Sequence, residues 1–277
     1  MLYNHGSSRP VNSGVRFLPL PQRDKDNDVS QLLTNIILRL LVLCLLVSTV
    51  TATACAQRVA NPQVENKATP APSNVQGVLW QDVPQKVDAK AKYLFYLHGA
   101  IIENEGVHAV SPRFGAYEYE QILNAFIDKG FIVISEPRPR GTDVEKYAVK
   151  VVGQVTALLK AGVPPQRITV VGGSRGGQIA IATSTLLKNK DVNFVVVAGC
   201  GNGYFYSHFP INLYGNVLSI YDYKDDTGAG SCRRFLDKAT GLNRHKEVEL
   251  RVGLGHGIVF HPLKEWIDLV VEWANQS

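Results

Sequence analysis

Residues 168–187 read ITVVGGSRGGQIAIATSTLL, and this stretch decides the fold. Its first four residues form a short apolar run rich in β-branched side chains, which favours a buried strand. From Gly176 onward the stretch is rich in Ala, Ile and Leu, which predicts a helix over residues 176–187. Between the two lies the hexapeptide GGSRGG, which contains the pattern G-x-S-x-G. The stretch therefore predicts a tight strand-to-helix turn that carries Ser174 at its tip.

The glycines of this turn have a steric purpose. A serine at a strained strand-to-helix turn has close neighbours, and Gly172 and Gly176 remove Cβ atoms that would clash with them. The turn exposes the Ser174 hydroxyl at a helix N-terminus, where the helix dipole favours developing negative charge. A dinucleotide-binding pattern needs glycine in place of Ser174, and a P-loop needs Gly-Lys-Ser/Thr. We interpret Ser174 as a nucleophile; the alternative is an ordinary capping serine.

Strands and helices alternate along the rest of the chain. The expected strands are short continuous apolar runs, as strands covered on both faces require, and their alternation with helices indicates parallel βαβ units. We therefore predict an α/β fold with a mostly parallel twisted sheet and helices on both faces. The expected strands are residues 93–97, 131–134, 168–171, 194–197, 217–221 and 248–252, and the expected helices are residues 116–128, 176–187, 262–275 and one that begins at the capping box of residues 142–145.

An activated serine needs a general base and a group that orients this base. In this class of fold the acid and then the histidine follow the serine along the chain. His256 lies in GLGHG, after the last expected strand, although an unsupported surface histidine is the alternative. The segment SIYDYKDD at residues 219–226 offers Asp222, Asp225 and Asp226 as candidates for the acid.

These pieces resemble the α/β-hydrolase superfamily over about residues 92–275. The double-glycine form of the serine turn is similar to that of prolyl-oligopeptidase-like and dienelactone-hydrolase-like members. The resemblance implies that Ser174 attacks an acyl carbon and that His256 takes its proton and returns it to the leaving group. It also implies that Asp225 is the acid, with Asp222 at a position where the family has glycine. The matching pieces are LHGA at 97–100, GGSRGG at 172–177, SIYDYKDD at 219–226 and GLGHG at 253–257.

The resemblance further implies an oxyanion hole made of the backbone N–H groups of Arg175 and Ala100. Arg138 and Arg140 follow the strand expected at residues 131–134, and the carboxyl ends of parallel strands face the site. We predict that these two arginines bind a carboxylate or phosphate group of the substrate. The alternative is that they are surface arginines paired with neighbouring glutamates.

Composition sets outer limits on the function. The chain has 277 residues, of which 45% are hydrophobic and 19% charged, which suits one large globular domain. The net charge is +5 without a Lys/Arg-rich run, so nucleic-acid binding is not expected. Acyl transfer through serine needs no cofactor, and no His and Cys spacing in the sequence is typical of a metal site.

The N-terminal part predicts export. Residues 40–50 (LLVLCLLVSTV) form an apolar run that small residues follow. This run is shorter than the roughly 20 residues of a transmembrane helix, so we interpret it as a secretory signal rather than an anchor. We assign residues 1–56 to a leader and signal peptide, 57–75 to a flexible tether rich in Pro, Asn, Ala and Ser, and 76–277 to the catalytic domain.

The cysteines refine this prediction. Ala52-Thr53-Ala54-Cys55 resembles a bacterial lipobox, which would attach a lipid to Cys55 and the protein to a membrane. The alternative is cleavage around residues 54–56 and release of a soluble periplasmic protein. In such an oxidising compartment Cys200 and Cys232 would form a disulfide, unless they are two buried free thiols.

The sequence as a whole predicts an exported serine hydrolase that cleaves a carboxylic ester of a small molecule. Two alternatives stay open. One is an amide or peptide hydrolase with the same residues, and the other is a non-catalytic binding lipoprotein on the same scaffold, because a fold does not fix a function.

Overall fold

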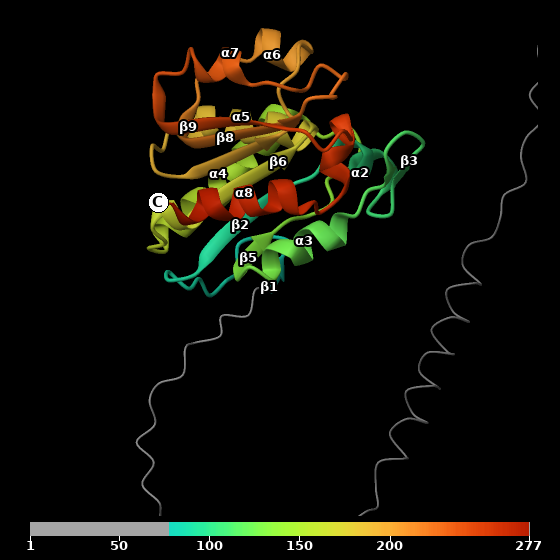
Figure 1. The fold of residues 1–277 in the computed structure, drawn as a ribbon. Coiled ribbons are helices and arrows are strands. Elements are labelled where there is room, and N and C mark those ends of the chain that lie inside the picture. The colour runs from blue at the N-terminus through green and yellow to red at the C-terminus, as the bar shows by residue number, and fades with distance from the viewer. Residues whose placement is uncertain (1–77, 277) are drawn as a thin grey trace, which may run out of the picture. The chain divides into compact units, whose positions relative to one another are not determined.

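A seven-stranded parallel sheet forms the centre of the computed structural model, which describes residues 78–276 (Figure 1). The strand order is β1-β5-β2-β6-β7-β8-β9, and every neighbouring pair is parallel. All strands therefore end at the same edge of the sheet. The strands are β1 (Val78–Trp80), β2 (Lys92–Leu97), β5 (Phe131–Ile134), β6 (Ile168–Gly173), β7 (Asn193–Val197), β8 (Tyr214–Asp222) and β9 (Gly241–Leu250).

Helices cover both faces of this sheet, which confirms the predicted α/β class (Figure 1). Helices α3 and α8 pack on one face, and α4 and α5 pack on the other. A small hairpin, β3 (Val110–Ser111) with β4 (Gly115–Ala116), lies outside the main sheet. The helices are α2 (Ala100–Glu105), α3 (Tyr119–Ile127), α4 (Val144–Lys160), α5 (Arg175–Leu187), α6 (Tyr204–His208), α7 (Arg233–Leu236) and α8 (Lys264–Asn275), with 3-10 turns η1 (Pro165–Arg167) and η2 (Gly255–Phe260).

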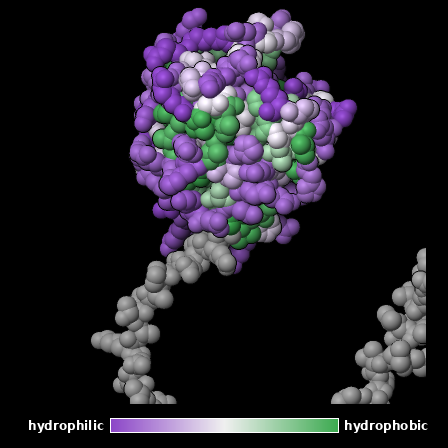
Figure 2. Space-filling model, turned by 45° about the vertical axis from the view of Figure 1, so that its right-hand side comes forward, coloured by the Kyte–Doolittle hydropathy of each residue, from purple (hydrophilic) through white to green (hydrophobic). Residues whose placement is uncertain are grey.

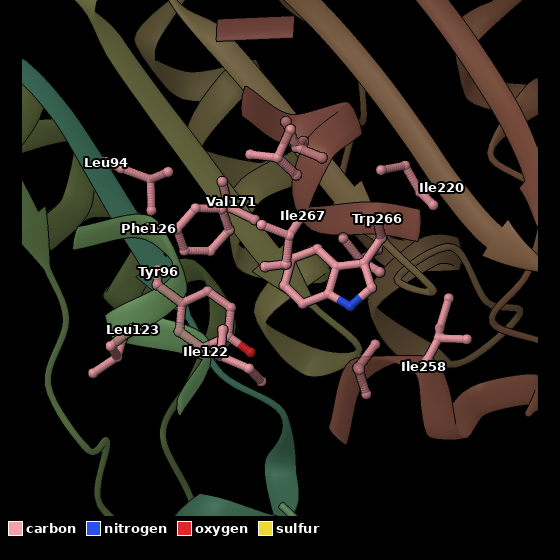
Figure 3. Packing of buried hydrophobic residues seen from close by; sticks show 14 of the residues in the cluster. Leu94, Tyr96, Ile122, Leu123, Phe126, Val171, Ile220, Ile258, Trp266 and Ile267 are labelled. Carbon is pink, nitrogen blue, oxygen red and sulfur yellow. The ribbon is translucent and has the colours of Figure 1, made fainter. Parts of the chain in front are cut away.

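The core has one layer on each side of the sheet, because successive side chains of a buried strand point to opposite faces. In β2, Leu94 and Tyr96 belong to the layer under α3 and α8, whereas Phe95 belongs to the layer under α4 and α5. Figure 3 shows the first layer, where Phe126 of α3 lies close to Trp266 of α8. Their ring centroids are 5.8 Å apart in an edge-on arrangement. This packing fixes the sheet on which the site is built.

The sequence-based boundaries hold best for the central elements. The strand predicted at residues 248–252 is wrong in extent, because β9 begins at Gly241 with a polar, partly exposed segment that has no apolar run. The N-cap predicted at Thr142 lies one residue later, at Asp143, whose side chain accepts the capping hydrogen bond from the Lys146 N–H. Strand β1 and the short helices α2, α6 and α7 were not predicted.

The predicted leader, signal peptide and tether, with Cys55, lie outside the described residues. Within residues 78–276 no helix is long and apolar enough to cross a membrane. The face shown in Figure 2 is mostly hydrophilic, and its hydrophobic residues gather in separate patches.

A disulfide joins Cys200, just after β7, to Cys232, at the start of α7. The two Cα atoms are 5.1 Å apart, and 32 positions separate the cysteines in the sequence. The segment that this bond closes contains β8 and the loop that follows it. The closed segment therefore includes all three candidate acids: Asp222 at the end of β8, and Asp225 and Asp226 in the loop after it.

Candidate active site

Ser174 lies at the tip of the turn between β6 and α5, with φ 53° and ψ −118°. Positive φ is uncommon for a residue with a side chain and has to be held by the surrounding structure. Here the Ser174 N–H donates to the Val197 carbonyl at 2.9 Å, and the Ser174 carbonyl accepts from the Gly177 N–H at 2.9 Å. The turn is therefore anchored to the neighbouring strand β7 and to the helix that follows.

The flanking glycines are required by contact distances. A Cβ atom on Gly172 would lie 2.1 Å from the Gly176 carbonyl oxygen. A Cβ atom on Gly176 would lie 1.8 Å from the Leu97 carbonyl oxygen at the end of β2. Both distances are far below van der Waals contact and involve backbone atoms, which cannot move aside like a flexible side chain. The close packing of β6, α5 and β2 thus depends on glycine at both positions.

A chain of hydrogen bonds leads from Ser174 into the protein. Ser174 Oγ lies 2.8 Å from His256 Nε2, and His256 Nδ1 lies 2.9 Å from Asp225 Oδ2. The His256 side chain is 12% exposed and that of Asp225 is fully buried. Burial raises the pKa of Asp225, but hydrogen bonds from His256 and Thr227 outweigh it and lower the pKa overall. The ionised carboxylate holds the proton on Nδ1, which leaves Nε2 free to accept the serine proton.

The order of these residues along the chain decides the type of fold. The serine follows β6, the acid follows β8, and the histidine lies in η2 after the last strand. Serine, acid and histidine in this order on the carboxyl edge of a parallel sheet are the arrangement described for one fold. This is an α/β-hydrolase fold.

Thr227 supports the acid and was not predicted from the sequence. Its hydroxyl donates to Asp225 Oδ1 at 2.6 Å, and its backbone N–H donates to the same oxygen at 3.0 Å. The hydroxyl oxygen also lies 3.2 Å from His256 Nδ1. The turn in which an aspartate accepts from the N–H two residues later does not separate the candidates, because Asp222 makes the same turn with the Lys224 N–H.

Asp222 has a different partner set from Asp225. It is buried, and its carboxylate accepts from the N–H groups of Gly253 and Gly255 at 2.9 Å and of Lys224 at 3.1 Å. Burial raises its pKa, but the backbone hydrogen bonds outweigh this and lower the pKa overall. Asp222 thus joins the acid loop to the glycine-rich segment that carries His256.

Asp226 points away from the histidine. It forms an ion pair at 2.7 Å with Arg113 of the β3–β4 hairpin, and both side chains are more than half exposed (62% and 57%). The next residue of the hairpin, Phe114, places its ring 6.0 Å from the His256 ring. The structure therefore brings Asp225, but neither Asp222 nor Asp226, to His256, and it adds an aromatic wall that sequence reasoning missed.

The two predicted oxyanion donors start helices beside the serine. Arg175 is the first residue of α5 and Ala100 the first residue of α2. The first N–H groups of a helix have no partner within it and are available to an anion. The segment that leads into α2 is close, since a Cβ atom on Gly99 would lie 3.6 Å from Ser174 Cβ. The Gly99 N–H donates to the Tyr117 hydroxyl at 3.3 Å, which holds this segment in place.

His98 is a buried, neutral residue of the segment that leads into α2. Its Nε2 accepts from the Arg138 N–H at 2.8 Å, so its Nδ1 carries the proton and donates to the Gly99 carbonyl at 2.9 Å. Burial, and then the charge of Arg138, lower the pKa of His98 to about 3. His98 therefore stays uncharged and shapes the turn that leads to Ala100.

Glu103 of α2 joins this segment to the serine turn, a role that was not predicted from the sequence. Its Oε1 lies 2.9 Å from Arg138 Nε, and its Oε2 lies 3.2 Å from Arg175 Nε. The Glu103 side chain is 3% exposed and that of Arg138 is 0% exposed. This corrects the prediction that Arg138 contacts the substrate, because its guanidinium is used inside the protein. Arg140 is exposed and donates to the Asn104 carbonyl at 2.6 Å.

Across residues 78–276, no group of three or more His, Cys, Asp and Glu side chains is placed to hold a metal ion.

Comparisons with known proteins give low similarities. No family model matches the chain, and no curated protein matches it. Among solved structures it is similar to SOBER1 of Arabidopsis thaliana, with 15% identity over 67% of this chain and 98% of that chain and a TM-score of 0.43. It is also similar to a truncated carbohydrate esterase from gut microbiota (15% identity, 70% and 90% covered, TM-score 0.46) and to Est1E of Butyrivibrio proteoclasticus with ferulic acid bound (12% identity, 70% and 91% covered, TM-score 0.44).

Proposed function

We propose that the chain is an exported serine hydrolase that cleaves a carboxylic ester of a small molecule through an acyl-enzyme on Ser174. The observation that carries this proposal is the hydrogen-bonded chain Ser174 Oγ, His256 Nε2, His256 Nδ1 and Asp225 Oδ2, with separations of 2.8 and 2.9 Å. A nucleophile, a base and an orienting acid within hydrogen-bond reach are the parts that acyl transfer requires.

The reaction has two halves. In the first, Ser174 Oγ attacks the ester carbon while His256 Nε2 takes the hydroxyl proton, and Asp225 stabilises the imidazolium that forms. The tetrahedral intermediate collapses, the alcohol leaves with the proton from Nε2, and the acyl group stays on Ser174. In the second half, water attacks the acyl carbon with His256 as base, and the acid product leaves.

The N–H groups of Arg175 and Ala100 are the proposed oxyanion donors. Both stand at the first position of a helix beside Ser174, so helix dipoles and backbone N–H groups act together on the negative charge. The buried Glu103, paired with Arg138 and Arg175, supports this by keeping α2 next to the serine turn.

The proposal is tested with p-nitrophenyl acetate as the ester and p-nitroacetanilide as the matched amide. We expect the wild type to hydrolyse the ester faster, and Ser174→Ala to lower kcat/KM by about 10⁴-fold or more. Ser207→Ala removes an exposed hydroxyl that is not part of the hydrogen-bonded chain of Ser174, His256 and Asp225, and it should leave this activity unchanged. Equal rates for Ser174→Ala and wild type would contradict the proposal. A faster amide reaction would replace esterase by amidase, and a lack of both reactions would favour a binding protein.

We also propose that the protein is exported and attached to a membrane through a lipid on Cys55. The disulfide between Cys200 and Cys232 supports export, because such bonds persist in oxidising compartments. Expression of the full chain in bacteria fed radiolabelled palmitate tests the anchor. We expect label on the wild type and none on Cys55→Ser; an unlabelled, soluble wild type would point to simple secretion.

A further inference from the structure

A cavity lies next to the serine turn, between the starts of α4, α5 and α6. The cavity has a volume of about 420 Å³, which falls within the roughly 300–1,000 Å³ of small-molecule sites. It is lined by residues 141–145, by Arg175 and Gln178 of α5, and by residues 203–205. Arg175 directly follows Ser174 in the chain, so one wall of this cavity is formed by the residue next to the proposed nucleophile.

An exposed aromatic ring borders this cavity. Tyr204 is 75% exposed, more than the other large hydrophobic side chains found exposed in residues 78–276. Its ring is stacked on that of His208 at 3.7 Å with an interplanar angle of 18°, and His208 Nδ1 lies 2.9 Å from the Tyr204 carbonyl oxygen. The ring is thus held as a flat platform. Such a surface leaves apolar area in water, which a ligand with a flat apolar face would cover.

The rest of the lining is polar. Asp143 and Glu145 are exposed carboxylates, and Gln178 presents a half-buried amide. These groups accept and donate hydrogen bonds of the kind that hydroxyl groups make. The lining holds the carboxylates of Asp143 and Glu145 against the single guanidinium of Arg175, and this negative excess disfavours an anionic ligand.

We propose that this cavity binds the sugar ring of a neutral carbohydrate ester. The C–H face of the ring packs on Tyr204, and its hydroxyls bind Asp143, Glu145 and Gln178. A sugar has both features in one molecule, since its ring carries apolar C–H groups on its faces and hydroxyls around its edge. The inference rests on the proposed function, because it names the substrate class that Ser174 acts on.

The kinetic test uses four acetyl esters that differ only in the alcohol: 6-O-acetylglucose, ethyl acetate, phenyl acetate and the anion 4-acetoxybenzoate. We expect Tyr204→Ala to lower kcat/KM for 6-O-acetylglucose by about ten-fold and to leave ethyl acetate unchanged. Trp80→Ala is the matched control, since it removes an exposed aromatic side chain on edge strand β1. This control should change none of the four.

Other outcomes of this test overturn the inference. An equal loss for phenyl acetate would show a platform for aromatic groups, and a preference of the wild type for 4-acetoxybenzoate over phenyl acetate, which also releases a phenol, would show an anion site. A Tyr204→Ala variant with unchanged kcat/KM for the sugar ester would show that the cavity is not used, while the esterase proposal would stand.

A binding measurement separates the inference from catalysis. The Ser174→Ala protein is titrated with 6-O-acetylglucose by calorimetry, with and without Tyr204→Ala. We expect the Tyr204→Ala change to raise Kd by about ten-fold. Binding by Ser174→Ala that depends on Tyr204, together with a wild type that hydrolyses none of the four esters, would refute the hydrolase and keep the sugar site. No binding by Ser174→Ala would refute the sugar site.

Discussion

The turn that carries Ser174 and the loop that carries Asp225 reach the same site by different means. The turn is held by backbone packing, since Cβ atoms on Gly172 or Gly176 would lie within 2.1 Å of backbone atoms. The acid loop is held by side chains, through Thr227, Asp222 and the disulfide of Cys200 and Cys232. The first region has no freedom to adjust, whereas the second depends on several separate contacts that can be removed one at a time.

This difference predicts two kinds of failure. A change in the serine turn should act on the whole fold, because β2, β6 and α5 meet there without spare space. A change in the acid loop should act on the reaction while much of the fold remains.

The largest expected effect is on the turn. Gly176→Ala places a Cβ atom 1.8 Å from the Leu97 carbonyl oxygen and should lower the free energy of unfolding by at least about 3 kcal/mol. Gly153→Ala is the control, since this exposed glycine of α4 has no atom within 4 Å of an added Cβ. It should raise the free energy of unfolding by about 0.5–1 kcal/mol. Urea unfolding measures both, and similar values for the two variants would disprove the steric account.

In the acid loop, the two aspartates should separate activity from stability. Asp225→Asn should lower kcat by about 10⁴-fold, because it favours the wrong histidine tautomer, with little loss of stability. Asp222→Asn should cost about 1–3 kcal/mol of unfolding free energy through its unpaired N–H donors, while the folded protein keeps most of its activity. Ester kinetics and urea unfolding on both variants decide this, and a reversed pattern would make Asp222 the acid.

Loss of the disulfide should weaken the same loop. The bond closes a segment with a sequence separation of 32, for which chain entropy gives about 3–4 kcal/mol of stability. The double variant Cys200→Ala, Cys232→Ala should lose about this amount in thermal or urea unfolding. The reduced wild-type protein is the control and should show the same loss; an unchanged stability in both would mean that the loop is held without the bond.

Thr227 should have a smaller effect than either aspartate. Thr227→Val removes the hydroxyl that lies 2.6 Å from Asp225 Oδ1 and should lower kcat by about ten-fold. Thr227→Ser keeps the hydroxyl and should restore the rate. If the serine variant were as slow as the valine variant, the loss would come from packing and not from the hydrogen bond.

The smallest effect concerns pH. The pKa of Asp222 is lowered from 3.8 in the folded protein, so its charge contributes stability that is present above this value and lost as pH falls through the folded pKa. The difference in unfolding free energy between wild type and Asp222→Asn should therefore be constant above about pH 5 and shrink as pH falls further, through the lowered pKa of the folded protein. A difference that grows toward low pH would contradict the assigned direction.

The same contrast explains what the sequence reveals. The serine turn and the central strands were predicted because their signals are local: glycines at fixed offsets from Ser174 and continuous apolar runs. The roles of Glu103 and Thr227 were not predicted, because the side chains that they contact are set by the folded structure. Arg138 was placed in the site because it follows a strand end, but a strand end fixes where a residue lies and not which way its side chain points.

The central claim is that the Ser174 hydroxyl is activated by His256, and covalent labelling tests it most directly. The wild type is treated with a fluorophosphonate, and the modified residue is located by peptide mass spectrometry. We predict stoichiometric phosphonylation of Ser174, with His256→Ala labelled far more slowly. A wild-type protein that stays unmodified, or that is labelled equally fast without His256, would contradict the account.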